Sequence, residues 1–299
     1  MNEMTSIKDN FSALHPIISF TYFAAVLFCS MFFLHPAFLV ISLVCSFMYS
    51  IYLNGAKAAK FNFAVLLPML LVLAIVNPLL NHSGMTVILY INDHAITTEA
   101  IFYGIAAATM FISVIAWFSC CNAVMSSDKF LYLFGRVIPA LSLIFSMVLR
   151  FVPKYKAQIK VISHAQTCIG KGVKNGNILT RAKNGMMILS ILTTWALENG
   201  IETADSMRAR GYGLSGRTAF STYRFDSRDK TAFAMLLVLI AAVFAGSLLG
   251  ENTVIYFPVI FAKPITNISF AVYAAYALLC LFPLELNLIT RYRAHACRG

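Results

Sequence analysis

The residues best suited to chemistry stand near the end of one polar segment in the second half of the chain. Three acids recur at i, i+4 and i+7, on one face of a helix: Glu198, Glu202 and Asp205. Two cations follow, Arg208 and Arg210, where they suit the negative end of the helix dipole, and Gly211 can take the left-handed conformation that ends a helix. Ala209 keeps this end narrow. The pattern favours recognition of a carboxylate by a fixed guanidinium. The alternative is that these residues serve only as an ordinary helix cap, which has the same sequence pattern.

A basic stretch precedes this helix, and no acid occurs between Asp128 and Glu198. Its cations are Arg150, Lys154, Lys156, Lys160, Lys171, Lys174, Arg181 and Lys183. At 100° per residue, 150–169 forms an apolar face of Phe151, Tyr155, Ile159, Ile162 and Ile169. The opposite face holds Arg150, Lys154, Lys160 and His164. We predict an amphipathic helix with one side on protein or lipid headgroups and the other in water, and binding to anionic lipid alone would also explain the charge.

Other chemistries lack their characteristic residues. No G-x-x-x-x-G-K-[ST] loop is present to bind ATP, and neither H-E-x-x-H, paired aspartates nor a Ser/His/Asp set occurs. The six histidines show no metal-ligand spacing, and the seven cysteines form no C-x-x-C pair. Cys120 and Cys121 lie inside an apolar run and are interpreted as small buried hydrophobic residues. We therefore expect no catalytic residues, no metal site and no cofactor.

The composition indicates that much of the chain lies in a lipid bilayer. The 299 residues are 60% hydrophobic and 12% charged, against roughly 45–50% and about 25% in an ordinary soluble domain. A soluble globule is excluded, because it could not bury so much apolar surface. The net charge of +11 would suggest nucleic acid for a soluble protein, but its placement along this chain points to membrane topology, and no nucleic-acid partner is expected. The first sixteen residues include Glu3, Lys8 and Asp9 and lack a basic n-region, so we expect no cleaved signal peptide.

Uncharged stretches of about 20 residues predict six transmembrane helices. Residues 10–56 contain two of them, and the others occupy 61–80, 100–125, 231–249 and 264–289. Within the first stretch, Leu14-His15-Pro16 recurs as Leu34-His35-Pro36. Because proline fits the first turn of a helix, we predict that Pro16 and Pro36 open the two helices, with a chance repeat as the alternative.

The distribution of Lys and Arg predicts the orientation, since basic loops stay in the cytoplasm. Cations follow the second and sixth helices and fill 126–230, whereas 81–99 has none and 250–263 has only Lys263. Both termini are therefore expected in the cytoplasm of a multi-pass plasma-membrane protein, with Ser83 outside and Cys297 inside.

We predict an all-α integral membrane protein in three parts. Residues 1–125 form helices one to four, 126–230 form a cytoplasmic module of amphipathic coupling helices, and 231–299 form the last membrane helices. Two apolar runs in the middle part, 137–149 and 186–197, are too short to span the bilayer and are expected to be interfacial or buried helices.

On these residues the sequence resembles the transmembrane T component of energy-coupling factor (ECF) transporters. These importers of vitamins and trace metals pair a T protein with two ATPases and a substrate-binding S protein. The mark of the family is two Ala-Arg-Gly tripeptides, each ending a coupling helix that docks on one ATPase. Ala209-Arg210-Gly211 looks like the second copy, and the likeness, which includes 216–229 and the outer stretch 77–100, covers most of the chain.

The first copy departs from the family pattern. In the segment 165–170, which aligns with Ala-Gln-x-Ala-Arg-Gly, Ile169 occupies the arginine position before Gly170, and the nearest cation is Lys171. Either Lys171 substitutes as a single charge, or Ile169 packs against an apolar surface of one ATPase; we favour packing. Leu14-His15-Pro16 similarly replaces the commoner Leu-Asp-Pro-Arg, and His15 is assigned no role.

The resemblance implies a coupling subunit that is not itself an enzyme. It would transmit ATP-driven movement of two ABC-type ATPases to a membrane-embedded S component for uptake of a vitamin or trace metal, and the S component would choose the substrate. The implied ATPase-coupling residues are Ala209, Arg210, Gly211, Ile169, Gly170 and Lys171. A secondary transporter without ATPases is the alternative, but such a protein needs ionisable groups near the bilayer midplane, whereas Glu285 lies near a helix end.

Overall fold

The computed structural model describes residues 10–81, 83–91, 94–135, 139–174, 176–212, 214, 223 and 225–296. Cys297 and residues 216–222, which carried two of the expectations above, lie outside the described residues. The chain forms two compact units: the bundle unit, residues 1–130 and 223–299, and the crossed-helix unit, residues 131–222. Each is considered by itself below.

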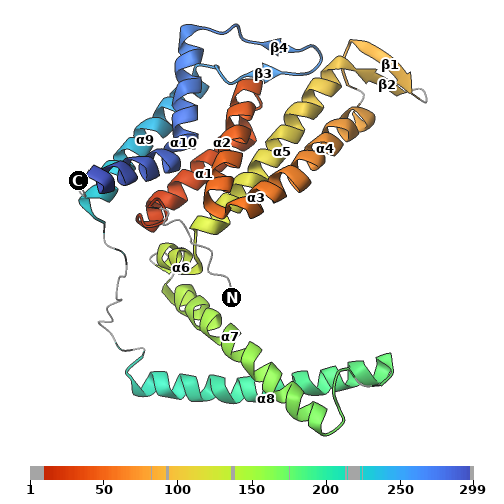
Figure 1. Ribbon diagram of the computed structural model, residues 1–299, viewed down its shortest axis with the longest axis vertical. Coiled ribbons are helices and arrows are strands. Elements are labelled where there is room, and N and C mark those ends of the chain that lie inside the picture. The colour runs from red at the N-terminus through yellow and green to blue at the C-terminus, as the bar shows by residue number, and fades with distance from the viewer. Residues whose placement is uncertain are drawn as a thin grey trace. The chain divides into compact units, whose positions relative to one another are not determined.

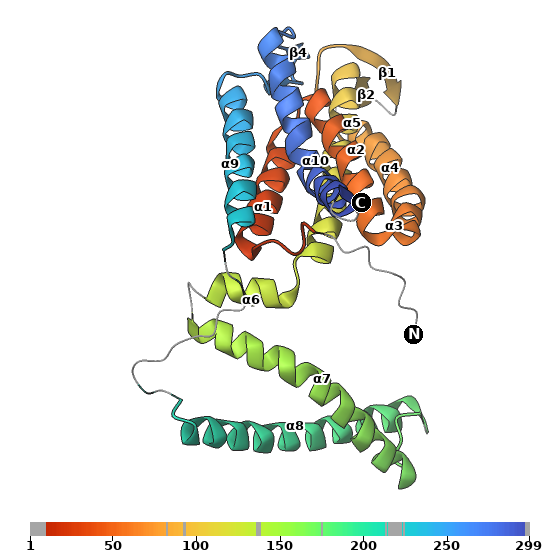
Figure 2. The ribbon, with the colours of Figure 1, turned by 60° about the vertical axis from the view of Figure 1, so that its left-hand side comes forward.

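The bundle unit is helical (Figures 1 and 2). Its elements are α1 (Pro16–Phe32), α2 (Pro36–Asn54), α3 (Ala56–Phe61), the π-helical turn η1 (Asn62–Leu66), α4 (Leu67–Leu80), α5 (Thr98–Val124), α9 (Ser227–Leu248) and α10 (Asn267–Ala296), with α6 (Ser127–Gly135) at its junction to the second unit. Among the described residues, five helical segments are long and apolar enough to cross a membrane, and α1 is a shorter apolar helix of 17 residues. The prediction of an all-α membrane protein is confirmed.

Histidine caps open both α1 and α2. His15 Nδ1 accepts a hydrogen bond from the backbone N–H of Ile17 at 3.4 Å, and His35 Nδ1 accepts one from Ala37 at 3.2 Å. A proline follows each histidine in the first helical turn, as predicted. The sequence interpretation gave His15 no role, and the structure makes it an N-cap. Histidine thus supplies the acceptor that aspartate, a preferred N-cap residue, would supply in the commoner motif.

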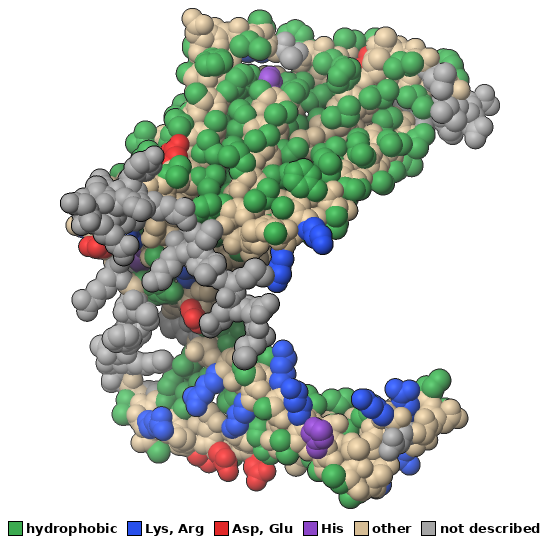
Figure 3. Space-filling view, in the orientation of Figure 1, with side chains coloured by type: hydrophobic (Ala, Val, Ile, Leu, Met, Phe, Trp, Pro, Cys, Tyr) green, Lys and Arg blue, Asp and Glu red, His purple; other side chains and the backbone are tan. Residues whose placement is uncertain are grey.

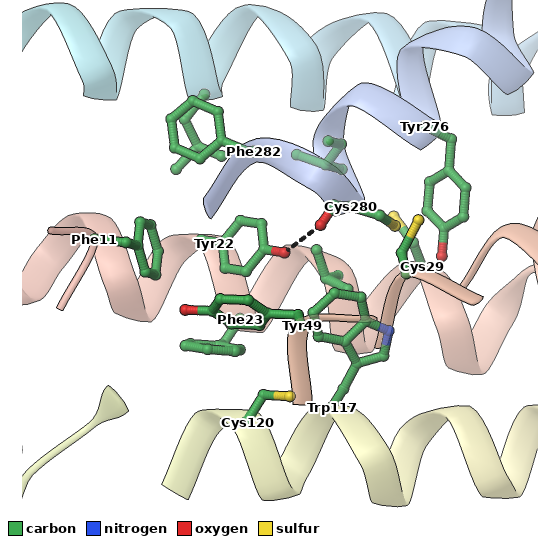
Figure 4. Close-up of a cluster of buried hydrophobic side chains, with 14 of the residues drawn as sticks. Phe11, Tyr22, Phe23, Cys29, Tyr49, Trp117, Cys120, Tyr276, Cys280 and Phe282 are labelled. Carbon is green, nitrogen blue, oxygen red and sulfur yellow. Dashed lines mark hydrogen bonds between the residues drawn. The ribbon is translucent and has the colours of Figure 1, made fainter. Parts of the chain in front are cut away.

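The core of the bundle unit is aromatic and draws on α1, α2, α5 and α10 (Figure 4). Tyr22, Tyr49, Trp117 and Tyr276 are fully buried. Trp117 Nε1 donates to the Ser42 hydroxyl at 3.0 Å, and the Tyr22 hydroxyl donates to the carbonyl of Cys280 at 3.0 Å. These two hydrogen bonds let the rings of Trp117 and Tyr22 fill the interior while their polar atoms stay paired. Cys120 is buried and Cys121 half-buried, and both are free thiols, as their interpretation as small core residues requires.

The helical segment 56–80 runs without a break through α3, η1 and α4, and η1 is a π turn. At this turn the N–H of Leu67 bonds the carbonyl of Asn62, five residues earlier. Asn62 and Leu66 are buried, whereas Phe63 is 58% exposed. Farther along, Gly104 of α5 faces α4, and a Cβ there would lie 3.1 Å from both the Cβ of Asn77 and the Cδ of Pro78. The absence of a side chain at Gly104 therefore permits the close packing of α4 and α5.

Two connections expected to be plain loops contain short antiparallel hairpins, which corrects that part of the prediction. The strand β1 (Val87–Ile91) pairs with β2 (His94–Thr97), and β3 (Val254–Ile255) pairs with β4 (Phe261–Ala262). The run Val-Ile-Leu-Tyr-Ile has the β-branched and aromatic residues that favour strands, but counting charges for topology does not detect this preference.

A buried carboxylate anchors the first hairpin to α5. Glu99 is 2% exposed and accepts hydrogen bonds from the backbone N–H of Thr86 at 3.3 Å and from both the Thr86 and Thr98 hydroxyls. Gly84 packs against this group with φ +134°, and a Cβ there would lie 2.7 Å from the Glu99 carboxylate and 2.8 Å from Thr97 Oγ1. This contact accounts physically for the glycine and acid in the outer stretch 77–100.

The second hairpin has its own carboxylate. Glu251 is 5% exposed, pairs with Lys263 at 2.5 Å and accepts a hydrogen bond from the Ser269 hydroxyl. Near it, His35 Nε2 lies 3.2 Å from the Tyr273 hydroxyl. These polar links tie the connection between α9 and α10 to α10, and Tyr273 of α10 to the start of α2.

The crossed-helix unit consists of α7 (Pro139–Cys168) and α8 (Ile178–Ala209), which cross each other (Figures 1 and 2). The apolar run 137–149 continues into the predicted amphipathic helix from residue 139 onward, giving one helix of 30 residues, and 186–197 is the middle of a helix of 32. The interpretation of 137–149 as a short helix of its own is therefore wrong, whereas 186–197 continues into the helix of Glu198, Glu202 and Asp205, as expected. Pro153 removes a backbone donor inside α7 without ending the helix.

A small contact joins the two helices. Ile162 of α7 and Ile188 of α8 are buried, and Tyr155 meets Trp195 edge to face with ring centroids 5.7 Å apart. Lys154, assigned above to the face in water, is exposed, and it also places its Nζ 5.3 Å from the centre of the Trp195 ring and bonds the side chain of Asn199. Its long stem reaches across the crossing point, which a helical wheel of one helix could not reveal.

Candidate functional site: two helix ends of the crossed-helix unit

The second tip, residues 209–212, is the end of α8. The N–H of Gly211 bonds the carbonyl of Arg208 at 2.9 Å, and the N–H of Tyr212 bonds that of Met207 at 3.0 Å. Gly211 has φ +79°. This is a Schellman-type cap, and its left-handed residue is most easily a glycine. The helix end predicted at Arg210 and Gly211 is confirmed, and the Arg210 side chain is exposed on the last residue before the turn.

The first tip, residues 168–171, is the end of α7 and has the same backbone. The N–H of Gly170 bonds the carbonyl of Thr167 at 3.0 Å, the N–H of Lys171 bonds that of Gln166 at 2.9 Å, and Gly170 has φ +78°. Both hydrogen bonds and the glycine φ have their counterparts at the second tip. The degenerate tripeptide therefore retains the shape of the intact one.

This equivalence fixes which residues correspond. Ile169 stands where Arg210 stands, immediately before the left-handed glycine, and its side chain is 63% exposed. Lys171 stands where Tyr212 stands, beyond that glycine. The candidate coupling residues thus form two groups on two helix ends, as the sequence predicts, and Lys171 does not share the position of the arginine.

The first tip is held in a fixed turn. Arg181 Nε donates to the carbonyl of Val173 at 2.9 Å, and Asn184 Nδ2 donates to that of Gly172 at 3.1 Å. Asn177 caps α8 by accepting the N–H of Ile178 at 3.1 Å. Side chains on α8 thereby fasten the connection from α7 and present it as a defined surface.

Large apolar side chains on this connection face solvent. Ile178 is 79% exposed and Leu179 84%, and Val173 is 38% exposed. The sequence interpretation missed them, although two aliphatic residues directly after the cap Asn177 were a readable signal.

The first tip is joined through residues 172–177 to the start of α8, and the second tip is the end of that helix (Figures 1 and 2). Thirty-two residues at 1.5 Å each give α8 a length of roughly 48 Å. That length exceeds the diameter of a small domain, about 30 Å.

Charge is segregated on the unit. Its described acids are the three on one face of α8, Glu198, Glu202 and Asp205, and all are exposed. Figure 3 shows them gathered on one side of α8, with Lys and Arg side chains mainly on the other faces. Within the described ranges, no three His, Cys, Asp or Glu side chains come together as metal ligands. The tips offer recognition of a partner surface through exposed side chains on rigid helix ends.

Comparison with known proteins gives a consistent set of similarities. The family model described as cobalt transport protein (CbiQ) matches residues 14–222. The chain is 33% identical over 111 residues to the energy-coupling factor transporter transmembrane protein EcfT of Bacillus selenitireducens, covering 37% of this chain and 41% of that protein. It is 30% identical over 115 residues to EcfT of Staphylococcus aureus (38% and 43%) and 31% over 113 residues to EcfT of Lactobacillus helveticus (38% and 41%). The matched part of the chain spans less than half the length of these relatives.

Proposed function

Because the chain belongs to the CbiQ family of cobalt transport proteins, we propose that it is the transmembrane coupling subunit of an ECF-type importer. In this role it transmits ATP-driven movement of two ABC-type ATPases to a membrane-embedded S component, which takes up a vitamin or trace metal. The names of the similar relatives support a transmembrane transporter component.

One observation carries the proposal: the ends of α7 and α8 have the same backbone geometry, and α8, roughly 48 Å long, runs from the connection after the first tip to the second tip. Equivalent shapes on these two helix ends suit two partner domains of similar fold, each engaging one tip. A movement of the partners toward each other would then act on both ends of α8 and on α7, which crosses it.

The exposed faces of α7 and α8 suit the S component. Aliphatic and aromatic side chains on both helices are largely exposed: Ile144, Phe145, Val148, Met186, Leu189, Leu197 and Ile201. An apolar surface of this extent marks an interaction site. We propose that the S component, itself embedded in lipid, covers part of it.

The orientation follows from the distribution of cations. We propose that residues 126–230 form the cytoplasmic coupling module of a plasma-membrane protein and that both termini share that side. The hairpins β1–β2 and β3–β4 then lie outside the cell.

Charge reversal at the second tip tests the proposed function. Arg210→Glu places a carboxylate against the carboxylate expected on an ATPase and should reduce or abolish assembly and transport. Arg208→Glu is the matched control, because Arg208 is equally cationic and exposed but stands before the tripeptide. The measurement is the amount of ATPase that co-purifies with the tagged full chain, together with substrate uptake. Equal effects of the two variants, or no effect of Arg210→Glu, would contradict the assigned role.

A further inference from the structure

We propose that the ATPase receiving the first tip presents an apolar groove at the point where the ATPase receiving the second tip presents a carboxylate. This inference rests on the proposed function, because it concerns the partners of the same two tips.

The first step is the positional equivalence of Ile169 and Arg210. Both precede a glycine with φ near +78°, and both sit in the same hydrogen-bonded turn. A partner surface that fits one tip therefore fits the backbone of the other. The residue presented to the same point of that surface is a guanidinium at one tip and an aliphatic side chain at the other.

The second step concerns Lys171. Its backbone N–H closes the turn to Gln166, so its side chain leaves the chain beyond the left-handed glycine, as that of Tyr212 does at the other tip. The Lys171 side chain is exposed and lies at the edge of the first tip, after Gly170, whereas Ile169 occupies the position before that glycine. Rim charges affect association rate and salt dependence more than affinity.

The third step is the chemistry of the surroundings. Ile169 is 63% exposed, and the connection that follows exposes Ile178 at 79% and Leu179 at 84%. The cations Lys171 and Lys174 flank this apolar group, and no acid stands between residues 168 and 183. The complementary surface has an apolar floor with acidic groups at its edge.

These steps exclude one groove for both tips. A carboxylate aimed at Arg210 would be buried without a partner against Ile169, and an unpaired buried charge is strongly unfavourable. A groove built for Ile169 would in turn leave the guanidinium of Arg210 unpaired. The tips thus discriminate between two partners by mismatch as well as by fit.

The composition of the purified complex provides the first test. The tagged full chain is isolated from its native cells, and the co-purifying chains that carry a P-loop are identified and quantified by mass spectrometry. We expect two non-identical ATPases in equal amounts. A single ATPase species present in two copies would overturn the inference, whereas the complete absence of ATPases would contradict the proposed function itself.

Substitution at Ile169 provides the second test, with each of these two ATPases titrated separately onto the purified full-length chain. Ile169→Arg restores the family residue, yet we expect it to weaken one ATPase by a factor on the order of 100, because it buries a charge in an apolar groove. Tighter binding of Ile169→Arg would reveal a retained carboxylate and overturn the inference. A second substitution at this position, Ile169→Asp, has Val161→Asp as its control. Val161 is 61% exposed on the same helix, away from the tip, so Val161→Asp should leave both affinities unchanged.

The same titration separates the two tips. Ile169→Asp and Arg210→Glu should each lose a different ATPase and retain the other. Lys171→Ala should change neither affinity more than about twofold, as expected for a rim charge. Loss of one ATPase on Lys171→Ala, or loss of the same ATPase in both tip variants, would contradict an apolar groove specific to the first tip.

Discussion

The two units of the molecule contain one tryptophan each, and these residues lie in opposite environments. Trp117 is fully buried among aromatic rings of the bundle unit and hydrogen-bonded to Ser42. Trp195 is only partly buried and packs on Tyr155 of the neighbouring helix. Among the described residues of the crossed-helix unit, the buried hydrophobic side chains are Ile162 and Ile188 alone. The bundle unit thus forms its own core, whereas the crossed-helix unit exposes the apolar surface that its partners are proposed to cover.

The largest expected effect tests this contrast directly. Trp117→Ala should lower the free energy of unfolding by about 3–5 kcal/mol, because it leaves a large cavity in a packed core. Trp195→Ala in the isolated chain should cost about 1 kcal/mol. Unfolding of the two variants in the same detergent, followed by circular dichroism, supplies the measurement. Similar losses would mean that the crossed-helix unit has a core of comparable strength.

Two glycines with positive φ sharpen the comparison. Gly84→Ala should destabilise the bundle unit by about 1–3 kcal/mol, because the conformation is strained and the new Cβ meets the bonded Glu99 carboxylate. Gly170→Ala meets no atom within 4 Å and should cost about 1 kcal/mol of backbone strain at the first tip. Thermal unfolding should therefore respond more to Gly84→Ala, and ATPase binding more to Gly170→Ala. The opposite ranking in either assay would contradict the division of roles.

Acidification should act on the histidine caps of the bundle unit. Burial lowers the pKa of His35 below its usual 6.5, an effect that the charge of Glu251 partly opposes. The folded protein therefore binds fewer protons at this site than the unfolded chain, and stability falls as the pH drops through about 6.5. A protonated ring also cannot accept the N–H of Ala37.

His35→Asn keeps a neutral acceptor at the cap and should reduce this pH dependence. The melting temperature measured from pH 8 to pH 5 provides the check. Part of the dependence should remain, since burial also lowers the pKa of His15. An unchanged pH profile in His35→Asn would show that the cap does not titrate in this range.

The carboxylate near His35 contributes with the same sign but in a more acidic range. Hydrogen bonds from Lys263 and then Ser269 hold the pKa of Glu251 below its usual 4.5. Its stabilising effect is therefore complete above that value and is lost as the pH falls through the lowered pKa of the folded state. Glu251→Gln should accordingly destabilise the protein at neutral pH but not at strongly acidic pH, and a pH-independent loss would rule out this ion pair as the cause.

The smallest effect on the protein is expected from a labelling experiment, which tests on which side of the membrane positions 83 and 168 lie. Cys168 at the first tip is exposed, whereas the other described cysteines are buried or half-buried. In a Cys297→Ser background, an impermeant thiol reagent on intact cells should modify Ser83→Cys and miss Cys168, and permeabilised cells should expose both. Labelling of Cys168 from outside would reverse the topology.

The sequence predicts the helices far better than their continuity. Among the described residues, uncharged length located the five segments long and apolar enough to span a membrane and the shorter helix α1, because that signal is local. Gly211 likewise marked the end of α8, whereas the first tip was located by the family resemblance. The junction of the apolar run near Val148 with the basic helix after Arg150 was missed, since a change in polarity along a helix looks like a boundary. The contact of Lys154 with Trp195 depends on how two helices cross, which no single-helix pattern contains.

The sequence places the candidate residues on two helix ends, but it does not show that the two ends have the same backbone shape. The tripeptide pattern placed Ile169 and Arg210 in register, but only the paired hydrogen bonds reveal that both turns have one shape. The aliphatic pair Ile178 and Leu179 could be noticed in the sequence after Asn177, but its exposure, 79% and 84%, follows only from the structure.

The π turn at Asn62–Leu66 has a consequence for the length of its segment. A helix turns by about 100° per residue, so closing the π turn to regular α-helical geometry with every residue kept would rotate the far half of the segment by about that angle. Asn77 and Pro78 would then leave the surface next to Gly104, and the exposed side chains of α4 would face α5 instead. The wide turn therefore absorbs one residue and keeps α4 in phase with α5. A one-residue deletion that also closes the π turn should be tolerated, whereas other insertions and deletions in 56–80 should be rarer among homologues than changes of residue type.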